Sequence, residues 1–126
     1  MASIFELEDP NFGRLTKEKT VKAGGDEATT LTAAESVESI VTVTPTAGRT
    51  YTTATAALIL AELGANNKVG QTFELVVVNL AAATHAVTVA GGTGVTVTGA
   101  AGVSAATSGR FIGRVASASA ITLYRA

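Results

Sequence analysis

The chain of 126 residues has no cysteine and no tryptophan, and only one histidine and two prolines. Without cysteine it forms neither a disulfide framework nor a thiolate-ligated metal site. The N-terminal stretch MASIFELEDP is acidic and lacks the basic start and the long apolar run of a secretory signal. The apolar stretches AALILAEL and ELVVVNLAAA are shorter than the roughly 20 residues of a membrane-spanning helix. We therefore expect a soluble protein that is made inside the cell.

Charged residues are also scarce, at 15% of the chain, against about 25% in a typical globular domain. Residues 1–38 carry eight acidic and four basic residues, whereas residues 39–126 carry two acidic and five basic ones. The mean hydropathy of the chain is positive, at +0.38. A surface with so few charges indicates burial against other chains in an oligomer. The alternative is a monomer with a threonine-coated surface.

The first 30 residues show no sustained hydrophobic period, because Pro10, Gly13 and Gly24 interrupt any regular element. We predict an extended N-terminal arm over residues 1–30 that docks on a partner, so that its deletion would leave the remaining domain folded. The alternatives are a plain tail and a first strand packed on its own domain. The candidate contact residues of the arm are its apolar side chains, Ile4, Phe5, Leu7, Phe12 and Leu15.

Beyond residue 30, short runs of alternating apolar and polar residues predict β-strands. A continuous apolar run in residues 72–80 predicts burial on both faces of that strand. The sequence ATAALILAEL (residues 54–63) is the one good helix pattern, which we expect to be largely buried, with Thr53 as its N-cap and Gly64 after its end. The predicted strands cover residues 39–45, 49–53, 72–80, 85–90, 94–100, 109–116 and 119–125.

The predicted fold is therefore mainly β, a single β-sandwich or barrel-like domain over residues 31–126 with one short helix and the N-terminal arm. The most glycine-rich stretch of this domain is AGGTGVTVTG. It does not spell GxGxxG, because Val97 stands where the third glycine belongs. Strand patterns flank it on both sides. We therefore predict a hairpin turn at residues 91–94, whose glycines serve backbone geometry.

The sequence contains no recognisable catalytic or metal-binding set. His85 is the only histidine, and Glu62 and Glu74 are the only acidic residues beyond residue 38. Paired carboxylates occur only near the N-terminus, in sequence that cannot hold the separation required for acid–base chemistry. Arg110 and Arg114 are spaced to share a strand face, but two arginines do not make a nucleic-acid surface. We expect no enzymatic activity, no cofactor, no metal and no nucleic-acid or membrane partner.

Several segments in a fixed order carry a resemblance to known proteins. They are TVTPTAGRTYTTATAALILAEL, VGQTFELVVVNLAAATHAVTVAGGTGVTVTG, SGRFIGRV and ITLYR, which together span roughly residues 40–126. In this order they resemble small structural proteins of tailed bacteriophages, namely head decoration (cement) proteins and trimeric β modules of virion fibres. Residues 1–38 carry no motif of this group.

The resemblance implies a virion structural protein. The leading expectation is a capsid decoration protein that binds the major capsid protein as a homotrimer, stabilises the shell, and lies on the capsid exterior after synthesis in the host cytoplasm. A phage fibre, collar or tail module is the alternative within the virion. A carbohydrate-binding β module is an alternative of another class, although no tryptophan is present to stack on sugar rings. A small hydrolase ranks last.

Overall fold

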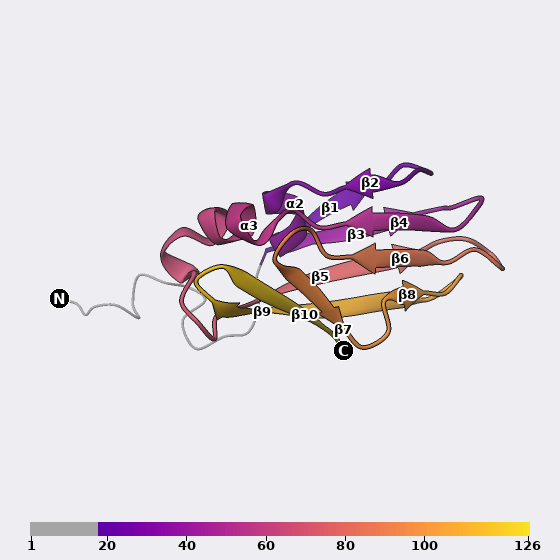
Figure 1. The fold of residues 1–126 in the computed structure, drawn as a ribbon. Helices are drawn as coiled ribbons and strands as arrows, with labels where there is room; N and C mark the ends of the chain where they lie inside the picture. Colours follow the sequence, from indigo (N-terminus) through magenta and orange to yellow (C-terminus); the bar gives the residue numbers. More distant parts are fainter. Residues whose placement is uncertain (1–17) are drawn as a thin grey trace.

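The computed structural model describes residues 18–126, which form two β-sheets that pack face to face. Figure 1 shows the helices gathered at one end of the sandwich and a row of loops at the other. The elements are β1 (Thr20–Ala23), β2 (Thr29–Thr30), α2 (Ala33–Glu38), β3 (Ser39–Val43), β4 (Arg49–Thr52), α3 (Ala56–Leu63), the 3₁₀ turn η1 (Gly64–Asn66), β5 (Thr72–Asn79), β6 (Val87–Ala90), β7 (Val95–Thr98), β8 (Gly102–Val103), β9 (Ser108–Ser117) and β10 (Ala120–Arg125).

The chain passes from one sheet to the other after nearly every strand. The six-stranded sheet has the order β1-β3-β5-β9-β10-β7, and the four-stranded sheet has the order β2-β4-β6-β8. Strands β1, β3 and β5 are mutually parallel, as are β2, β4 and β6. Parallel neighbours need a long crossover between them, and here a strand of the opposite sheet supplies part of each crossover.

Three consecutive segments, β1–β2, β3–β4 and β5–β6, therefore share one arrangement. In each, a strand of the six-stranded sheet is followed by a loop and a strand of the four-stranded sheet. We call the end of the sandwich with these loops the loop end (Figure 1). The chain returns at the opposite, helical end through α2 in the first segment and α3 in the second. In the third segment the glycine-rich stretch between β6 and β7 makes the return without a helix.

The core lies between the sheets and is built from the apolar positions of the alternating patterns. Tyr51, Leu75 and Phe111 are 0% exposed, and aliphatic side chains of both sheets surround them. In β3 and β10 the buried residues are those that the alternation predicted, Val41 and Val43 in one, and Ile121 and Leu123 in the other. The predicted class, a mainly β sandwich-like domain, is confirmed.

Residues Ala33–Glu38 form a helix, α2, although their sequence predicted at most one helical turn. Thr32 accepts a hydrogen bond from the Glu35 amide through its hydroxyl (3.2 Å), and the Glu35 carboxylate accepts one from the Thr32 amide (3.0 Å). This reciprocal pair is a capping box, which satisfies two amides that a helix start otherwise leaves unpaired. Residues 18–126 therefore contain two short α-helices, whereas the sequence predicted a single helix.

The second helix differs from its prediction at the start and in its burial. Thr55, not Thr53, is the N-cap, and its hydroxyl accepts a hydrogen bond from the Leu58 amide. Gly64 follows the helix, as expected, but its φ of +58° and ψ of −119° lie outside the left-handed helical region. One face of α3, which includes Ile59, packs on the core, but Leu58 on the other face is 57% exposed. The expectation that this helix is largely buried was wrong.

The boundary predicted at residue 30 was also wrong, because β1 and β2 belong to the two sheets. β1 pairs in parallel with β3, and β2 pairs in parallel with β4. Deletion of residues 1–30 would thus remove two strands and would not leave the domain intact. The candidate contact residues Ile4, Phe5, Leu7, Phe12 and Leu15 lie outside the described residues.

Candidate interaction surfaces

The outer face of the six-stranded sheet carries large apolar side chains on five of its six strands, among polar and charged ones. One row across it joins Val21, Ile40, Val76 and Arg110 as neighbours on adjacent strands. A parallel row joins Glu74, Ile112, Tyr124 and Thr98. We call the set Val21, Ile40, Val76, Val78, Ile112 and Tyr124 the outer apolar face.

The members of the outer apolar face are only partly covered within the described chain. Val21 is 64% exposed and Tyr124 is 43% exposed, and the other four side chains are half-buried. Val76 and Val78 belong to the run for which burial on both faces was predicted, but only the alternate residues of β5 point into the core. A sheet face with this composition is suited to contact with another protein surface.

A small group of charged side chains lies on the same sheet. The Glu74 carboxylate forms an ion pair with the Lys19 ammonium group (Nζ to Oε1, 3.6 Å) and a second one with the Arg110 guanidinium. Hydrogen bonding to Arg110 is the main cause that lowers the pKa of the Glu74 carboxyl from its ordinary value. Lys19 also donates to the Glu74 carbonyl oxygen (2.7 Å). Arg114 is exposed on β9 four residues from Arg110, so the two arginines do share a strand face.

The glycine-rich stretch is not a hairpin turn, because β6 and β7 lie in different sheets. Its backbone is committed to the protein itself. The Gly92 amide donates to the Thr53 hydroxyl (3.0 Å), the Thr93 carbonyl accepts from the Ala56 amide at the start of α3 (2.8 Å), and the Gly94 carbonyl accepts from the Ile121 amide (3.0 Å). The stretch thus joins α3 and β10 through its own backbone groups.

All three of these glycines are required by geometry. Gly94 has a φ of +84°, and an added Cβ there would lie 2.8 Å from the Ala56 Cβ. At Gly92 an added Cβ would lie 2.7 Å from the Thr53 carbonyl oxygen, and at Gly91 it would overlap the Val95 carbonyl oxygen. The requirement at Gly94 is conformational, and the requirement at Gly91 and Gly92 is close approach of two backbones. These contacts support the expected role of the glycines in backbone geometry, in a connection between sheets.

The loop end contains an apolar hollow and two strained residues. A cavity of about 380 Å³ lies beside the exposed Leu80, and its lining includes Val78 and Ala106. Ala106 and Thr84 are the two non-glycine residues with positive φ among the described residues, at +60° and +84°. His85 is half-buried in the neighbouring loop, where its carbonyl accepts a hydrogen bond from the Asn79 side chain (2.8 Å).

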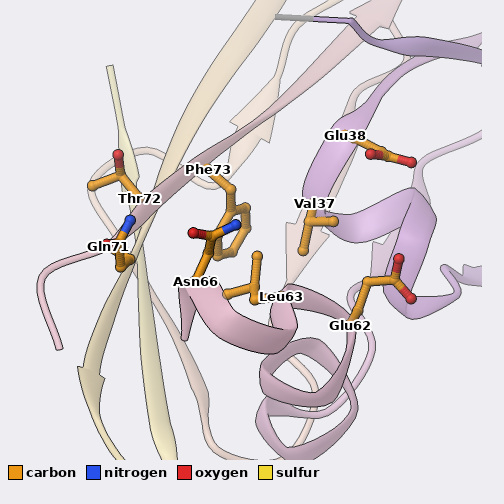
Figure 2. A pocket seen from close by; sticks show the side chains of 8 residues that line it. All are labelled: Val37, Glu38, Glu62, Leu63, Asn66, Gln71, Thr72 and Phe73. Carbon is orange, nitrogen blue, oxygen red and sulfur yellow. The ribbon is translucent and has the colours of Figure 1, made fainter. Parts of the chain in front are cut away.

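A second cavity, of about 310 Å³, lies at the helical end between the end of α2, the end of α3 and the start of β5 (Figure 2). Buried Val37 and Phe73 and partly buried Leu63 contribute its apolar side. Five polar side chains complete the lining, and we call the whole set the acidic pocket: Val37, Glu38, Glu62, Leu63, Asn66, Gln71, Thr72 and Phe73.

The acidic pocket joins carboxylates that are far apart in the sequence. Glu38 ends α2, and Glu62 lies in the last turn of α3. Sequence analysis missed the pair, because only the packing of α2 against α3 brings the two helix ends together. Within residues 18–126 no group of three or more His, Asp or Glu side chains is placed to hold a metal ion. None of the helices described there is long and apolar enough to cross a membrane.

No protein-family model, no curated protein and no solved structure was found to match this chain.

Proposed function

We propose that the protein is a structural component of a bacteriophage virion, a decoration protein that binds the major capsid protein on the exterior of the head as a homotrimer. The observation that carries the proposal is the outer apolar face, a broad sheet surface that is only partly covered within the described chain. The ordered resemblance over roughly residues 40–126 supports the virion assignment. The low charge of the chain supports burial of part of the surface in an assembly.

The outer apolar face is the proposed contact between subunits. A hydrophobic contact surface with a few charged groups is typical of interfaces in stable oligomers. In this arrangement Val21 and Tyr124 lose their solvent exposure when subunits meet, and the group around Glu74 contributes ion pairs beside them. The surface at the loop end and the helical end then stays accessible to the capsid.

The subunit contact is tested by introducing charge on the outer apolar face. Val21→Lys and Tyr124→Lys alter side chains that are already exposed in the single chain, so folding is expected to persist. Each should convert the oligomer to monomer, because association would bury an unpaired ammonium group. Leu80→Lys, on an exposed residue at the loop end, is the matched control and should keep the oligomer. Light scattering measures the mass; a wild-type monomer at micromolar concentration would contradict the proposal.

The capsid role is tested by sedimentation with purified phage heads that lack the protein. The full chain should pellet with the heads, and cryo-electron microscopy of the complex should place it on the outer surface. A variant that lacks residues 2–17 keeps β1 and β2, and it tests whether the contact residues predicted in the arm are needed. Failure of the full chain to pellet, or density on a fibre, collar or tail, would refute the decoration role.

A further inference from the structure

We propose that the acidic pocket receives the side chain of an arginine presented by a partner protein. The pocket lies at the helical end and is separate from the outer apolar face, so this inference does not rest on the decoration role. It rests on three independent properties of the pocket: its shape, its acceptor groups and the side chains that flank it.

The shape of the pocket suits a side chain with an apolar stem and a polar head. Val37 and Phe73 are 6% and 7% exposed and form the apolar side together with Leu63. In Figure 2 the two carboxylates lie on one side of these groups, and Gln71 lies on the other. The three methylene groups of an arginine pack well on such a surface while the guanidinium stays at the polar rim. The volume of about 310 Å³ accommodates one such side chain.

The acceptor groups of the pocket are uncommitted within residues 18–126. The ion pairs found there engage the acidic residues Asp26, Glu35 and Glu74, and none of them involves Glu38 or Glu62. Two carboxylates at the edge of one cavity, with no ion pair among the described residues, attract a positive group. A guanidinium offers five donors in a planar fork, which two carboxylates and neighbouring amide oxygens match better than they match a single ammonium.

Exposed apolar side chains beside the pocket indicate that the cation belongs to a protein rather than to a free small molecule. Leu58 is four residues before Glu62 on α3, so the two side chains lie on one helix face, and Leu58 is 57% exposed. Val69, which is 62% exposed, lies in the loop between Asn66 and Gln71 of the pocket. Arginine surrounded by apolar contacts is a frequent anchor of protein interfaces.

The test is a nuclear magnetic resonance titration of the full, isotopically labelled chain. The probe is N-acetyl-arginine methylamide at concentrations up to about 100 mM, which detects dissociation constants in the millimolar range. Saturable shifts are expected at the backbone amides of Glu38, Glu62 and the pocket loop. The citrulline analogue has the same shape without the charge and should produce no saturable shift. The lysine analogue should bind more weakly than the arginine probe.

Variants of the pocket separate local binding from general attraction to an acidic protein. The double variant Glu38→Gln/Glu62→Gln should weaken binding of the arginine probe by about tenfold or more, because charge-assisted hydrogen bonds become neutral ones. Glu27→Gln removes one carboxylate charge at the loop end, as Glu62→Gln does at the pocket, and should leave binding unchanged. Because Glu62 is exposed, the single variant Glu62→Gln serves if the double variant does not fold.

Three results would overturn the proposal. One is the absence of saturable shifts at the pocket. Another is equal binding of the citrulline or lysine analogue, which would remove the need for a guanidinium. The third is unchanged affinity in the Gln variants, or an equal loss in Glu27→Gln, which would place the attraction elsewhere.

Discussion

The two ends of the sandwich satisfy their backbone groups by different means. At the helical end each helix is capped locally, since Thr32 pairs with Glu35 and Thr55 with Leu58, each three residues apart. The hydroxyls of Ser36 and Thr53 add longer-range bonds there, because they accept from the Ala54 and Gly92 amides. At the loop end the side-chain contacts span long stretches of chain. Asp26 accepts hydrogen bonds from the Thr46 amide (3.0 Å) and from the Arg49 side chain (2.7 Å), which ties the first inter-sheet loop to the second.

The buried side-chain amide of Asn79 also joins separate segments at the loop end. Asn79 is 1% exposed, and its side chain donates to the carbonyls of His85 (2.8 Å) and Val103 (2.9 Å) and accepts from the Ala81 amide (3.0 Å). Ala81 and His85 lie in a loop and Val103 lies at the end of β8, so one side chain joins three separate backbone groups. Polar side chains thus join distant segments at both ends, and the helical end adds helix caps and the apolar packing of α3.

The largest loss of stability is expected when the apolar packing of the helical end is disrupted. Ile59→Ala removes a side chain that is 0% exposed in the core and should lower the free energy of unfolding by about 2–5 kcal/mol, through lost burial and a residual cavity. Leu58→Ala, on the next residue but 57% exposed, is the matched control, with an expected change of at most about 0.5 kcal/mol. Urea denaturation measures both. Equal losses would show that the exposed face of α3 is itself covered, for example in an oligomer.

An intermediate loss of stability is expected when the buried side-chain amide of the loop end is removed. Asn79→Ala should cost about 1–3 kcal/mol, because buried backbone groups lose their partners. Asn79→Leu restores the volume of the side chain but not its hydrogen bonds, so its cost should be similar. If Asn79→Leu were as stable as the wild type in thermal and urea unfolding, the loop end would be held by packing, and the contrast between the ends would fail.

The smallest effect is expected from the exposed carboxylate that joins the first two loops. Hydrogen bonds from Arg49 and Thr46 hold the pKa of the Asp26 carboxyl well below its ordinary value. A lowered folded-state pKa stabilises the protein above the unfolded-state pKa, and this contribution is lost as the pH falls through the folded-state value. Asp26→Asn should therefore lower the urea midpoint at pH 7, and the gap to the wild type should narrow as the pH falls below about 4.

The control for this pH dependence is Glu27→Gln, which alters the neighbouring carboxylate. The pKa of the Glu35 and Glu74 carboxyls is also lowered, by hydrogen bonds from the Thr32 amide and from Arg110 respectively. The wild type therefore loses stability in acid for more than one reason, and only the difference between wild type and Asp26→Asn reports on the loop contact. A gap that stays constant from pH 7 to pH 3 would contradict the assignment.

Much of the secondary structure could be predicted because its signals are local. The alternation of β3 and β10 identified their buried residues, and Gly64 marked the end of α3. The capping box at Thr32 and Glu35 is equally local, and the pattern T-x-x-E was the signal that could have found it. β1 and β2 were missed because their four and two residues are too short to show a period among charged and threonine residues.

The sequence by itself determined the alternation of β3 and β10, because a period of two assigns side chains to opposite faces without reference to a partner. The continuous apolar run of β5 hid the alternation of that strand. Only the tertiary structure decided which strand lies beside which. Glycines at residues 91–94 suit a hairpin and a passage between sheets equally well, and contacts with Thr53, Ala56 and Ile121 selected the passage. The acidic pocket and the outer apolar face arise in the same way, because segments distant in the chain meet only when both sheets have formed.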